Sequence, residues 1–170
     1  AVLLEEGWER VTLSRVAQRA GYARTTLYRH WPQRLDLLRD LISAEAQVAH
    51  AHLTGDLRTD LVAELDAFRR GVVSGLGRVM VAIGQQARDD AELADLNRWM
   101  RADGGRVLDE LVGRAVASGD LRSGPATDAA VALLVGPVLF RYLFEDDGDL
   151  DRRVVESVGG SFLDPSRPRP

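Results

Sequence analysis

Apolar residues recur at intervals of three and four along most of the chain, and this spacing restricts the protein to helices. One such series contains Leu61, Leu65, Phe68 and Val72. This spacing places side chains on one face of an α-helix, whereas a half-buried strand needs alternation with a period of two. Because no segment sustains that alternation, the sequence predicts an all-α fold.

The composition excludes several classes of protein. The chain has 170 residues, 45% of them hydrophobic and 28% charged, which is usual for a globular protein. It has no cysteine, and this excludes disulfides, thiol catalysis and cysteine-ligated metal sites. No apolar run approaches the ~20 residues that a membrane span needs, and no signal-peptide pattern opens the chain. We therefore expect a cytoplasmic protein without a membrane partner.

Periodicity and turn residues divide the chain into segments. The first residue is Ala and lies inside a helical pattern, so we expect a short N-terminal segment to precede it. Helices are predicted at residues 1–7, 12–20, 23–31, 32–50, 61–83 with a joint at Gly75 and Gly77, 91–118 with a kink or break at Gly104 and Gly105, 129–140 and 150–162. Gly55 and Asp56 mark a break between the early and the later helices. We predict one domain over residues 1–50 and a larger helical domain over 51–170.

The positive charge is concentrated near the beginning of an otherwise acidic chain. The formal net charge is −4, yet the stretch from Arg10 to Arg34 holds six arginines and no acid. Within it, Thr12 suits a helix N-cap, Ala17 is small enough for a close helix crossing, and Gly21 suits a sharp turn. Two short helices joined by such a turn form a helix-turn-helix, which binds the groove of a DNA duplex.

The second of these helices, predicted at residues 23–31, has a polar outer face. At 100° per residue, Leu27 lies on the buried face, while Thr25 and Arg29 point about 160° away from it. An arginine pairs with guanine through two hydrogen bonds, and threonine and tyrosine hydroxyls bind phosphates. The DNA-binding residues predicted here are Thr12, Arg24, Thr25, Thr26, Tyr28, Arg29, His30 and Arg34.

These residues resemble the DNA-binding domain of the tetracycline-repressor (TetR) family of bacterial regulators. The residues that match the family's pattern are Thr12, Val16, Ala17, Ala20, Gly21, Thr26, Leu27, Tyr28, His30 and Trp31, with Arg34 at the position of a lysine. The strong match covers about residues 1–45, and a weaker one covers Leu134–Phe144. Two positions depart from the pattern, because Ala23 replaces a capping Ser and Tyr22 replaces a smaller Val.

A homodimer is expected because one short recognition helix reads only a few base pairs, so that two half-sites are needed. The helix predicted at residues 129–140 is apolar all round and must be covered on every side. The resemblance implies that this helix and the last one form a four-helix bundle from two subunits. The expected interface residues are Ala130, Leu134, Pro137, Val138, Arg141, Val154, Val158 and Phe162.

The resemblance also implies a small hydrophobic effector whose binding releases the protein, as a repressor, from a palindromic operator. The residues expected to line its pocket are Phe68, Met80, Ile83, Trp99, Met100, Phe140 and Tyr142. The helix predicted at residues 32–50 connects the two domains and is the expected lever between effector and DNA.

No cofactor, metal site or enzymatic activity is predicted. His50 and His52 do not share a helix face, and no P-loop, GxSxG or HExxH motif occurs. Two alternatives stay open from the residues alone. One is a DNA-binding regulator that needs no ligand. The other is a helical small-molecule-binding protein or enzyme that binds no DNA and uses its first helices only for packing.

Overall fold

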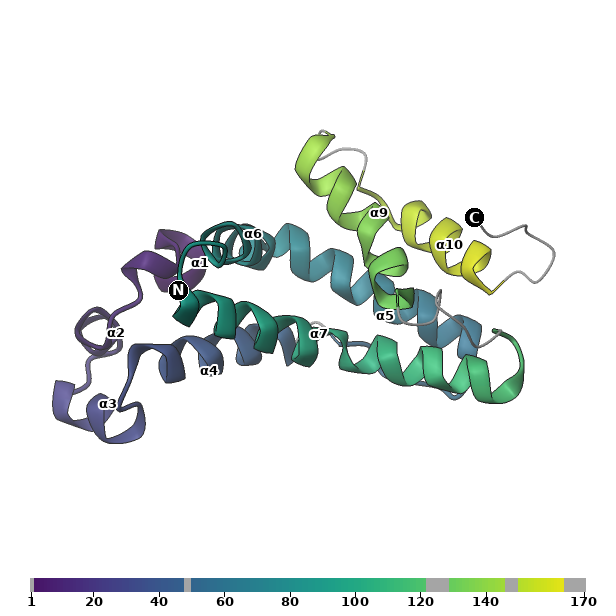
Figure 1. Cartoon of the computed structure of the whole chain (residues 1–170). Helices are drawn as coiled ribbons and strands as arrows, with labels where there is room; N and C mark the ends of the chain where they lie inside the picture. The colour runs from purple at the N-terminus through teal and green to yellow at the C-terminus, as the bar shows by residue number, and fades with distance from the viewer. Residues whose placement is uncertain (1, 48–49, 122–128, 146–149, 164–170) are drawn as a thin grey trace. The chain divides into compact units, whose positions relative to one another are not determined.

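The computed structural model describes residues 2–47, 50–121, 129–145 and 150–163, and the regular structure in these ranges is entirely helical (Figure 1). The elements are α1 (Val2–Glu6), η1 (Trp8–Arg10), α2 (Leu13–Ala20), α3 (Arg24–His30), α4 (Arg34–Gln47), α5 (Leu57–Gly71), the π-helical η2 (Val72–Leu76), α6 (Gly77–Gln86), α7 (Ala91–Ser118), α9 (Ala130–Phe144) and α10 (Arg152–Phe162). This confirms the all-α prediction. None of the described helices is both long and apolar enough to cross a membrane.

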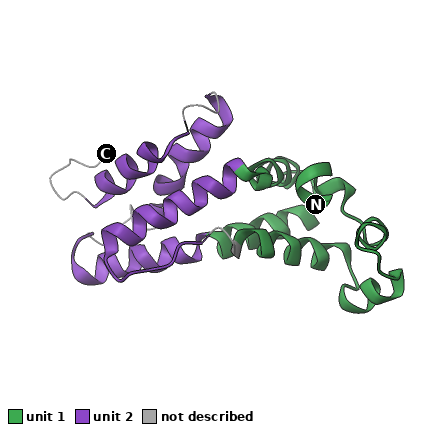
Figure 2. Cartoon of the chain, turned by 180° about the vertical axis from the view of Figure 1, so that it is seen from behind, with its two compact units in different colours: residues 1–48, 74–104 green, residues 49–73, 105–170 purple. Residues whose placement is uncertain are grey.

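The chain forms two compact units, each built from two stretches of sequence (Figure 2). The first unit contains residues 1–48 and 74–104, and the second contains residues 49–73 and 105–170. The first division lies close to the domain boundary predicted after residue 50. The sequence pattern did not indicate that α6 and the beginning of α7 belong to the same unit as the N-terminal helices.

The core of the first unit explains this arrangement. Leu37 and Leu38 of α4 are at most 1% exposed, as are Ile83 of α6 and Leu96 of α7. These side chains belong to one hydrophobic cluster with Trp8 and other residues of the first helices. The N-terminal helices are too short to bury a core among themselves, so α6 and α7 supply apolar surface to them.

The second unit is built around α5, α9 and α10, which pack on one another (Figure 1). Leu65 of α5, Leu134 and Val138 of α9 and Val155 of α10 are fully buried. Helix α10 approaches α5 closely at Gly159, where an added Cβ atom would lie 2.8 Å from Val62 Cγ2. That distance is shorter than carbon atoms tolerate, so the packing of α10 on α5 requires glycine at this position.

Glycines end helices where the sequence predicted it. The first helix ends before Gly7, whose φ is 87°, and the predicted joint is present at Gly75, whose φ is 104°. Of the kink or break predicted at Gly104 and Gly105, the break is wrong, because α7 continues through both residues. A glycine inside a helix costs only about 1 kcal/mol relative to alanine, and packing along a long helix outweighs that cost.

The other helix ends differ from the sequence prediction by a few residues. Helix α4 begins at Arg34 and not at Pro32, and the predicted apolar helix continues past residue 140 to Phe144. The last helix begins at Arg152, because the side chain of Asp151 caps it by accepting a hydrogen bond of 2.8 Å from the Arg153 N–H. The predictions for residues 48–49, 122–128, 146–149 and 164–170 lie outside the described residues.

Two buried carboxylates of α5 hold the segment that precedes this helix. Asp60 is fully buried and accepts hydrogen bonds from Thr54 N–H and Thr54 Oγ1, both 2.7 Å, and from Gly55 N–H at 3.0 Å. Glu64, one turn later, accepts the Ala51 N–H at 2.9 Å and lies 2.6 Å from His50 Nδ1. A carboxylate removed from water is stable only with such donors, so these acids fasten residues 50–55 to α5.

The same contacts set the ionisation of Asp60. Burial on its own raises the pKa of this carboxyl, but the hydrogen bonds from Thr54, Gly55 and Arg114 outweigh burial, and the pKa is lowered overall. Hydrogen bonds from Thr59 likewise lower the pKa of Asp56, the N-cap of α5. As pH falls, the unfolded chain therefore binds these protons before the folded chain does.

We predict that Asp60→Asn lowers the free energy of unfolding at pH 7 by about 1–3 kcal/mol, because an amide cannot accept all of these hydrogen bonds. The stability due to Asp60 is present above its unfolded pKa of about 4 and is lost as pH falls through the folded pKa. Thermal unfolding of both proteins between pH 7 and pH 3 should therefore show a smaller acid-induced loss in the variant. Parallel pH profiles would contradict this assignment.

Candidate nucleic-acid interface

The first helix of the helix-turn-helix begins and ends where the sequence predicted. Thr12 caps α2, because its Oγ1 accepts a hydrogen bond of 3.1 Å from the Arg15 N–H. Gly21 ends α2 in the left-handed conformation, with φ of 71° and ψ of 22°. The Tyr22 N–H then donates to the Ala17 carbonyl at 3.0 Å, which closes the turn. Helices α2 and α3 pack against each other after this turn (Figure 1).

Helix α3 has an almost entirely polar surface. Leu27 is 5% exposed and is the one buried residue of this helix. Ala23 stands at the N-cap and its side chain makes no capping hydrogen bond, as expected from its departure from the family pattern. Trp31 follows the helix, packs on the core and donates from Nε1 to Asp40 Oδ2 at 2.7 Å. Trp31 is therefore held against the core of the first unit.

The structure brings most of the predicted DNA-binding residues onto one exposed helix. Arg24, Thr25, Tyr28, Arg29 and His30 are exposed and Thr26 is partly buried. Thr12 is exposed at the start of α2, and its hydroxyl hydrogen stays available because the oxygen is the capping acceptor. This surface combines guanidinium, hydroxyl, phenol and imidazole groups, which are the side chains that contact phosphates and base edges.

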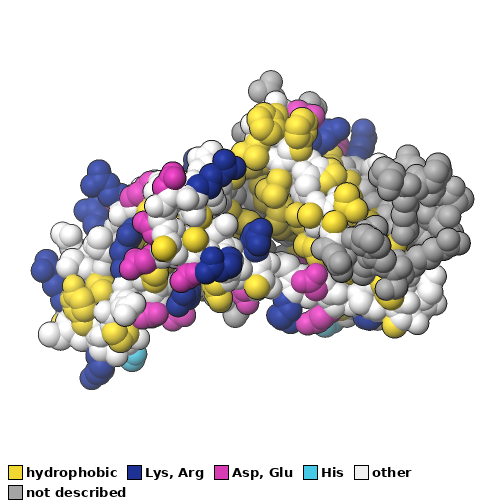
Figure 3. Space-filling model, in the orientation of Figure 1, with side chains coloured by type: hydrophobic (Ala, Val, Ile, Leu, Met, Phe, Trp, Pro, Cys, Tyr) yellow, Lys and Arg dark blue, Asp and Glu magenta, His cyan; other side chains and the backbone are white. Residues whose placement is uncertain are grey.

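The basic stretch is less uniform than its sequence. Arg15 donates to Glu6 Oε2 at 2.7 Å, and Arg19 pairs with both Glu5 and Glu6. In contrast, no hydrogen bond or ion pair joins Arg24 or Arg29 to another described residue. Arg24 and Arg29 therefore place unneutralised positive charge on α3, and arginine side chains are visible at the left of Figure 3, where Figure 1 places α2 and α3.

Arg34 lies in a different environment. Its Nε donates to the Val11 carbonyl and its Nη2 to the Trp8 carbonyl, both at 2.7 Å. Its guanidinium carbon lies 4.9 Å from the centre of the Trp8 ring. The sequence pattern did not indicate these contacts, since Trp8 and Val11 are more than 20 positions away along the chain.

Tyr22 is an exposed aromatic residue that the sequence prediction left out of the interface. It is 65% exposed and directly follows the turn at Gly21, whereas Tyr28 on α3 is 51% exposed. Its replacement of a smaller valine was the signal that could have identified it. A phenol at this position adds a hydrogen-bonding group beside the recognition helix.

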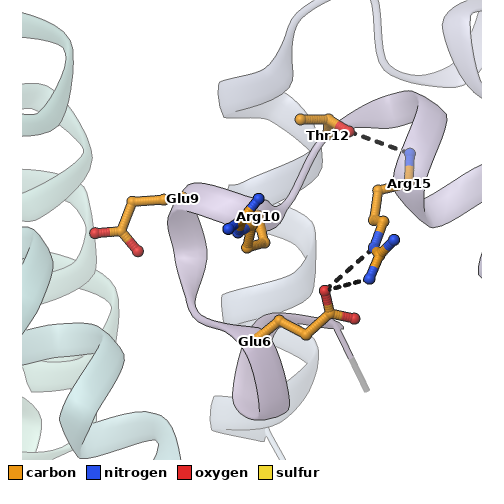
Figure 4. Close-up of a pocket in the computed structure, with 5 residues that line it drawn as sticks. All are labelled: Glu6, Glu9, Arg10, Thr12 and Arg15. Carbon is orange, nitrogen blue, oxygen red and sulfur yellow. Dashed lines mark hydrogen bonds and ion pairs between the residues drawn. The ribbon is translucent and has the colours of Figure 1, made fainter.

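A polar cleft of about 570 Å³ lies beside the start of α2 and is lined by Glu6, Glu9, Arg10, Thr12 and Arg15 (Figure 4). The carboxylate of Glu6 is turned toward the Arg15 guanidinium, as the dashed lines in Figure 4 show. Glu9 accepts a hydrogen bond from Gln86 Nε2 at 3.2 Å. These acids bind neighbouring side chains and thereby hold the first helices in place. We therefore assign the cleft no ligand.

The residues predicted for an effector pocket belong to different parts of the structure. Met80, Ile83, Trp99 and Met100 belong to the core of the first unit or pack against it, whereas Phe68 and Tyr142 pack against the core of the second. Phe140 is 59% exposed on α9. Neither unit contains the whole set. Their role in binding an effector stays a prediction.

The residues predicted for a dimer interface also divide into groups. Ala130, Leu134 and Val138 are fully buried within the second unit, so a partner subunit cannot cover them further. Pro137 is exposed, Arg141 is partly buried and pairs with Glu145, and Val154, Val158 and Phe162 are partly buried. The large side chains that α9 exposes are Leu133, Phe140, Leu143 and Phe144. The sequence could not show which face of α9 is exposed, because apolar residues surround the whole helix.

Among the described residues, no group of three or more histidine, aspartate or glutamate side chains is arranged to bind a metal ion. His50 is engaged with Glu64, 2.6 Å away.

The turn at Gly21, the exposed basic face of α3 and the supporting α2 define a helix-turn-helix DNA-binding unit. Comparison with known proteins agrees with this class. Residues 1–41 match the profile described as "Bacterial regulatory proteins, tetR family", and residues 51–159 match "Tetracyclin repressor-like, C-terminal domain". Because these matches span most of the sequence, the chain belongs to the tetR family of bacterial regulatory proteins. It is a DNA-binding transcriptional regulator.

Several relatives are similar over most of their length. The chain is 25% identical to the uncharacterized HTH-type transcriptional regulator YdeS of Bacillus subtilis, over 95% of this chain and 82% of YdeS. It is 29% identical to the DNA-binding transcriptional repressor TetR of Mycobacteroides abscessus, over 78% of this chain and 74% of that repressor.

Solved structures have the same fold. The crystal structure of the TetR family transcription regulator SCO0332 has a TM-score of 0.76 and 32% identity, and the match covers 98% of this chain and 93% of that one. The flavonoid-responsive regulator FrrA has a TM-score of 0.61 and 20% identity over the same shares of the two chains, which supports the fold alone.

We predict that Gly21→Ala destabilises the protein by about 1 kcal/mol, because alanine has to adopt a positive φ at this turn. No atom lies within 4 Å of the position of the added Cβ, so the cost is conformational and not steric. Gly104→Ala is the matched control, since its Cβ also meets no atom within 4 Å but its backbone is helical. This control should stabilise the protein by about 0.5–1 kcal/mol in urea unfolding. Effects of the same sign would contradict the prediction.

Proposed function

We propose that the protein is a homodimeric repressor that binds a palindromic operator and leaves it when a small hydrophobic effector binds. The observation that carries this proposal is the exposed face of α3, where Arg24 and Arg29 have no carboxylate partner among the described residues. The repressor named among its relatives supports the sign of regulation. A cytoplasmic location follows from this function, since the operator is chromosomal DNA.

The proposed roles on α3 follow from the chemistry of the side chains. Arg29 presents a guanidinium fork one helical turn from Thr25, and such a fork matches the two acceptors on the major-groove edge of guanine. Thr25 reaches a base edge or a thymine methyl group, and Tyr28 donates its phenol hydrogen to a phosphate. Arg24 and His30, near the two ends of α3, add contacts to the phosphate backbone of the DNA. Base contacts give specificity, whereas phosphate contacts fix the position of the helix.

Dimerisation is supported by the apolar surface of α9. Leu133, Phe140 and Phe144 are each more than 50% exposed, and the rings of Phe140 and Phe144 are 5.1 Å apart. Pro137 lies on the same face of the helix, and hydrophobic side chains are gathered over α9 in Figure 3. An exposed apolar patch of this kind marks a protein–protein contact. The partly buried Val154, Val158 and Phe162 of α10 continue the proposed interface.

The proposed effector acts through linkage. A small molecule changes DNA affinity only if it binds better to the conformation that binds DNA worse. Helix α4 leaves the DNA-binding helices, and residues 50–55, which follow it, are fastened to α5 by Asp60 and Glu64. A displacement of α5 on ligand binding therefore pulls on α4 through this segment.

We predict that Arg29→Ala weakens binding to the preferred duplex by about 1–3 kcal/mol and relaxes preference at one base pair. The probe is the duplex that the wild-type protein enriches from a random library, and fluorescence anisotropy measures affinity for it and for random DNA. Arg98→Ala is the control, because Arg98 is exposed on α7 and pairs with Asp95, away from the helix-turn-helix sequence. Equal losses of affinity for the preferred and the random duplex would show that Arg29 does not contact a base.

We predict that Phe140→Glu converts the dimer to a monomer, because the charge would be placed on the apolar face of α9. Sedimentation velocity at micromolar concentration measures this change. Leu53→Glu, at an exposed apolar residue outside α9, should leave the dimer intact. A monomeric wild-type protein would refute the dimer, and a dimeric Phe140→Glu protein would move the interface elsewhere.

A further inference from the structure

Helix α3 packs against α2 but buries little of its own surface. It is seven residues long, and Leu27 is its one buried side chain. A helix this short is unstable alone, and one buried side chain fixes its orientation only in part. The orientation that α3 presents to DNA must therefore be set by the segments at its two ends.

The segment before α3 is fixed to α2 by the turn at Gly21. The segment after it is fixed by two side chains. Trp31 donates to Asp40 on α4, and Arg34, the first residue of α4, donates to the carbonyls of Trp8 and Val11. Val11 directly precedes Thr12, the N-cap of α2. The Arg34 side chain therefore joins the start of α2 to the start of α4, and α2, the turn and α3 lie between these two points.

We propose that Arg34 is a positioning residue for DNA recognition and not a phosphate ligand. Its side chain links the segment before α2 to the start of α4 and thereby sets the orientation of α3. The inference rests on the proposed function of α3 as the DNA reader. It departs from the expectation that this residue binds phosphate.

The geometry of the guanidinium group separates the two roles. The edge formed by Nε and Nη2 is one of those that can bind two oxygens of a phosphate side by side. In Arg34 both of these nitrogens donate to backbone carbonyls at 2.7 Å, and the plane lies against the Trp8 ring. Trp8 is 7% exposed and belongs to the core of the first unit, so the clamp is tied to a fixed point.

Arg34→Lys and Arg34→Ala distinguish a clamp from a phosphate ligand. Lysine keeps the charge and binds phosphate as a point charge, but a single ammonium nitrogen cannot reproduce the planar fork over Trp8. Both variants therefore remove a clamp, whereas lysine preserves phosphate binding and alanine abolishes it. Arg24→Lys and Arg24→Ala are the matched controls, because Arg24 is exposed on α3 and pairs with no other described residue.

The first measurement uses the free protein. Amide hydrogen exchange in residues 24–31 should be about tenfold faster in both Arg34 variants than in the wild type, with exchange in α6 unchanged. The Arg24 variants should exchange like the wild type. This result does not depend on DNA, so it tests the clamp even if the protein were found to bind no duplex. Unchanged exchange in both Arg34 variants would overturn the proposal.

The second measurement compares the enriched duplex with random DNA over a range of salt concentrations. The proposal expects both Arg34 variants to lose about tenfold in preference for the enriched duplex, with the salt slope on random DNA unchanged. Arg24→Ala should instead reduce that slope by about 0.9 for each phosphate that the arginine neutralised. Wild-type behaviour of Arg34→Lys, together with a reduced slope in Arg34→Ala, would identify a phosphate ligand and refute the clamp. Faster exchange without any loss of preference would also refute it.

Discussion

A helix that reads DNA has to keep its outer face polar, and this requirement removes the apolar contacts that would otherwise hold it. Helix α3 meets the requirement with Leu27 as its one buried side chain. Its neighbours therefore provide the rigidity: the left-handed turn at Gly21 before it, and the Trp31–Asp40 and Arg34 contacts after it. These contacts rest in turn on a core to which α6 and α7 contribute, so the DNA-binding surface depends on residues far along the sequence.

The arginines of α2 and α3 also fall into two groups, those that pair within the protein and those that stay exposed on α3. The protein has a net charge of −4, and exposed charges are screened beyond about 8–10 Å at physiological salt. What DNA encounters is therefore the local charge around α3 and not the total. Glu5 and Glu6 of α1 pair with Arg15 and Arg19 of α2, so the charge of those arginines is neutralised and the ion pairs hold α1 against α2. Arg24 and Arg29, in contrast, leave unneutralised positive charge on α3.

Much of the DNA-binding unit could be predicted because its signals are local. Thr12 and Gly21 have their predicted conformations, since capping and turns depend on a few adjacent residues. The contacts of Arg34 were not predictable, because they join residues that the fold alone brings together. The exposed face of α9 was not predictable either. Leu133 and Leu134 look equivalent in the sequence, yet Leu133 is 53% exposed and Leu134 is fully buried.

The close approach of α10 to α5 at Gly159 has a consequence for the geometry of the proposed dimer. Helix α10 packs on α5 and also on α9, whose outer side carries Phe140 and Phe144. A relative with any side chain at the position of Gly159 has to hold α10 farther from α5, because a Cβ atom would collide with Val62. Because α10 also packs on α9, that displacement would change the support of α9 and its aromatic face. In the homodimer proposed above, this single small residue inside one subunit limits the angle at which two subunits can meet, and with it the spacing of the half-sites that they can span.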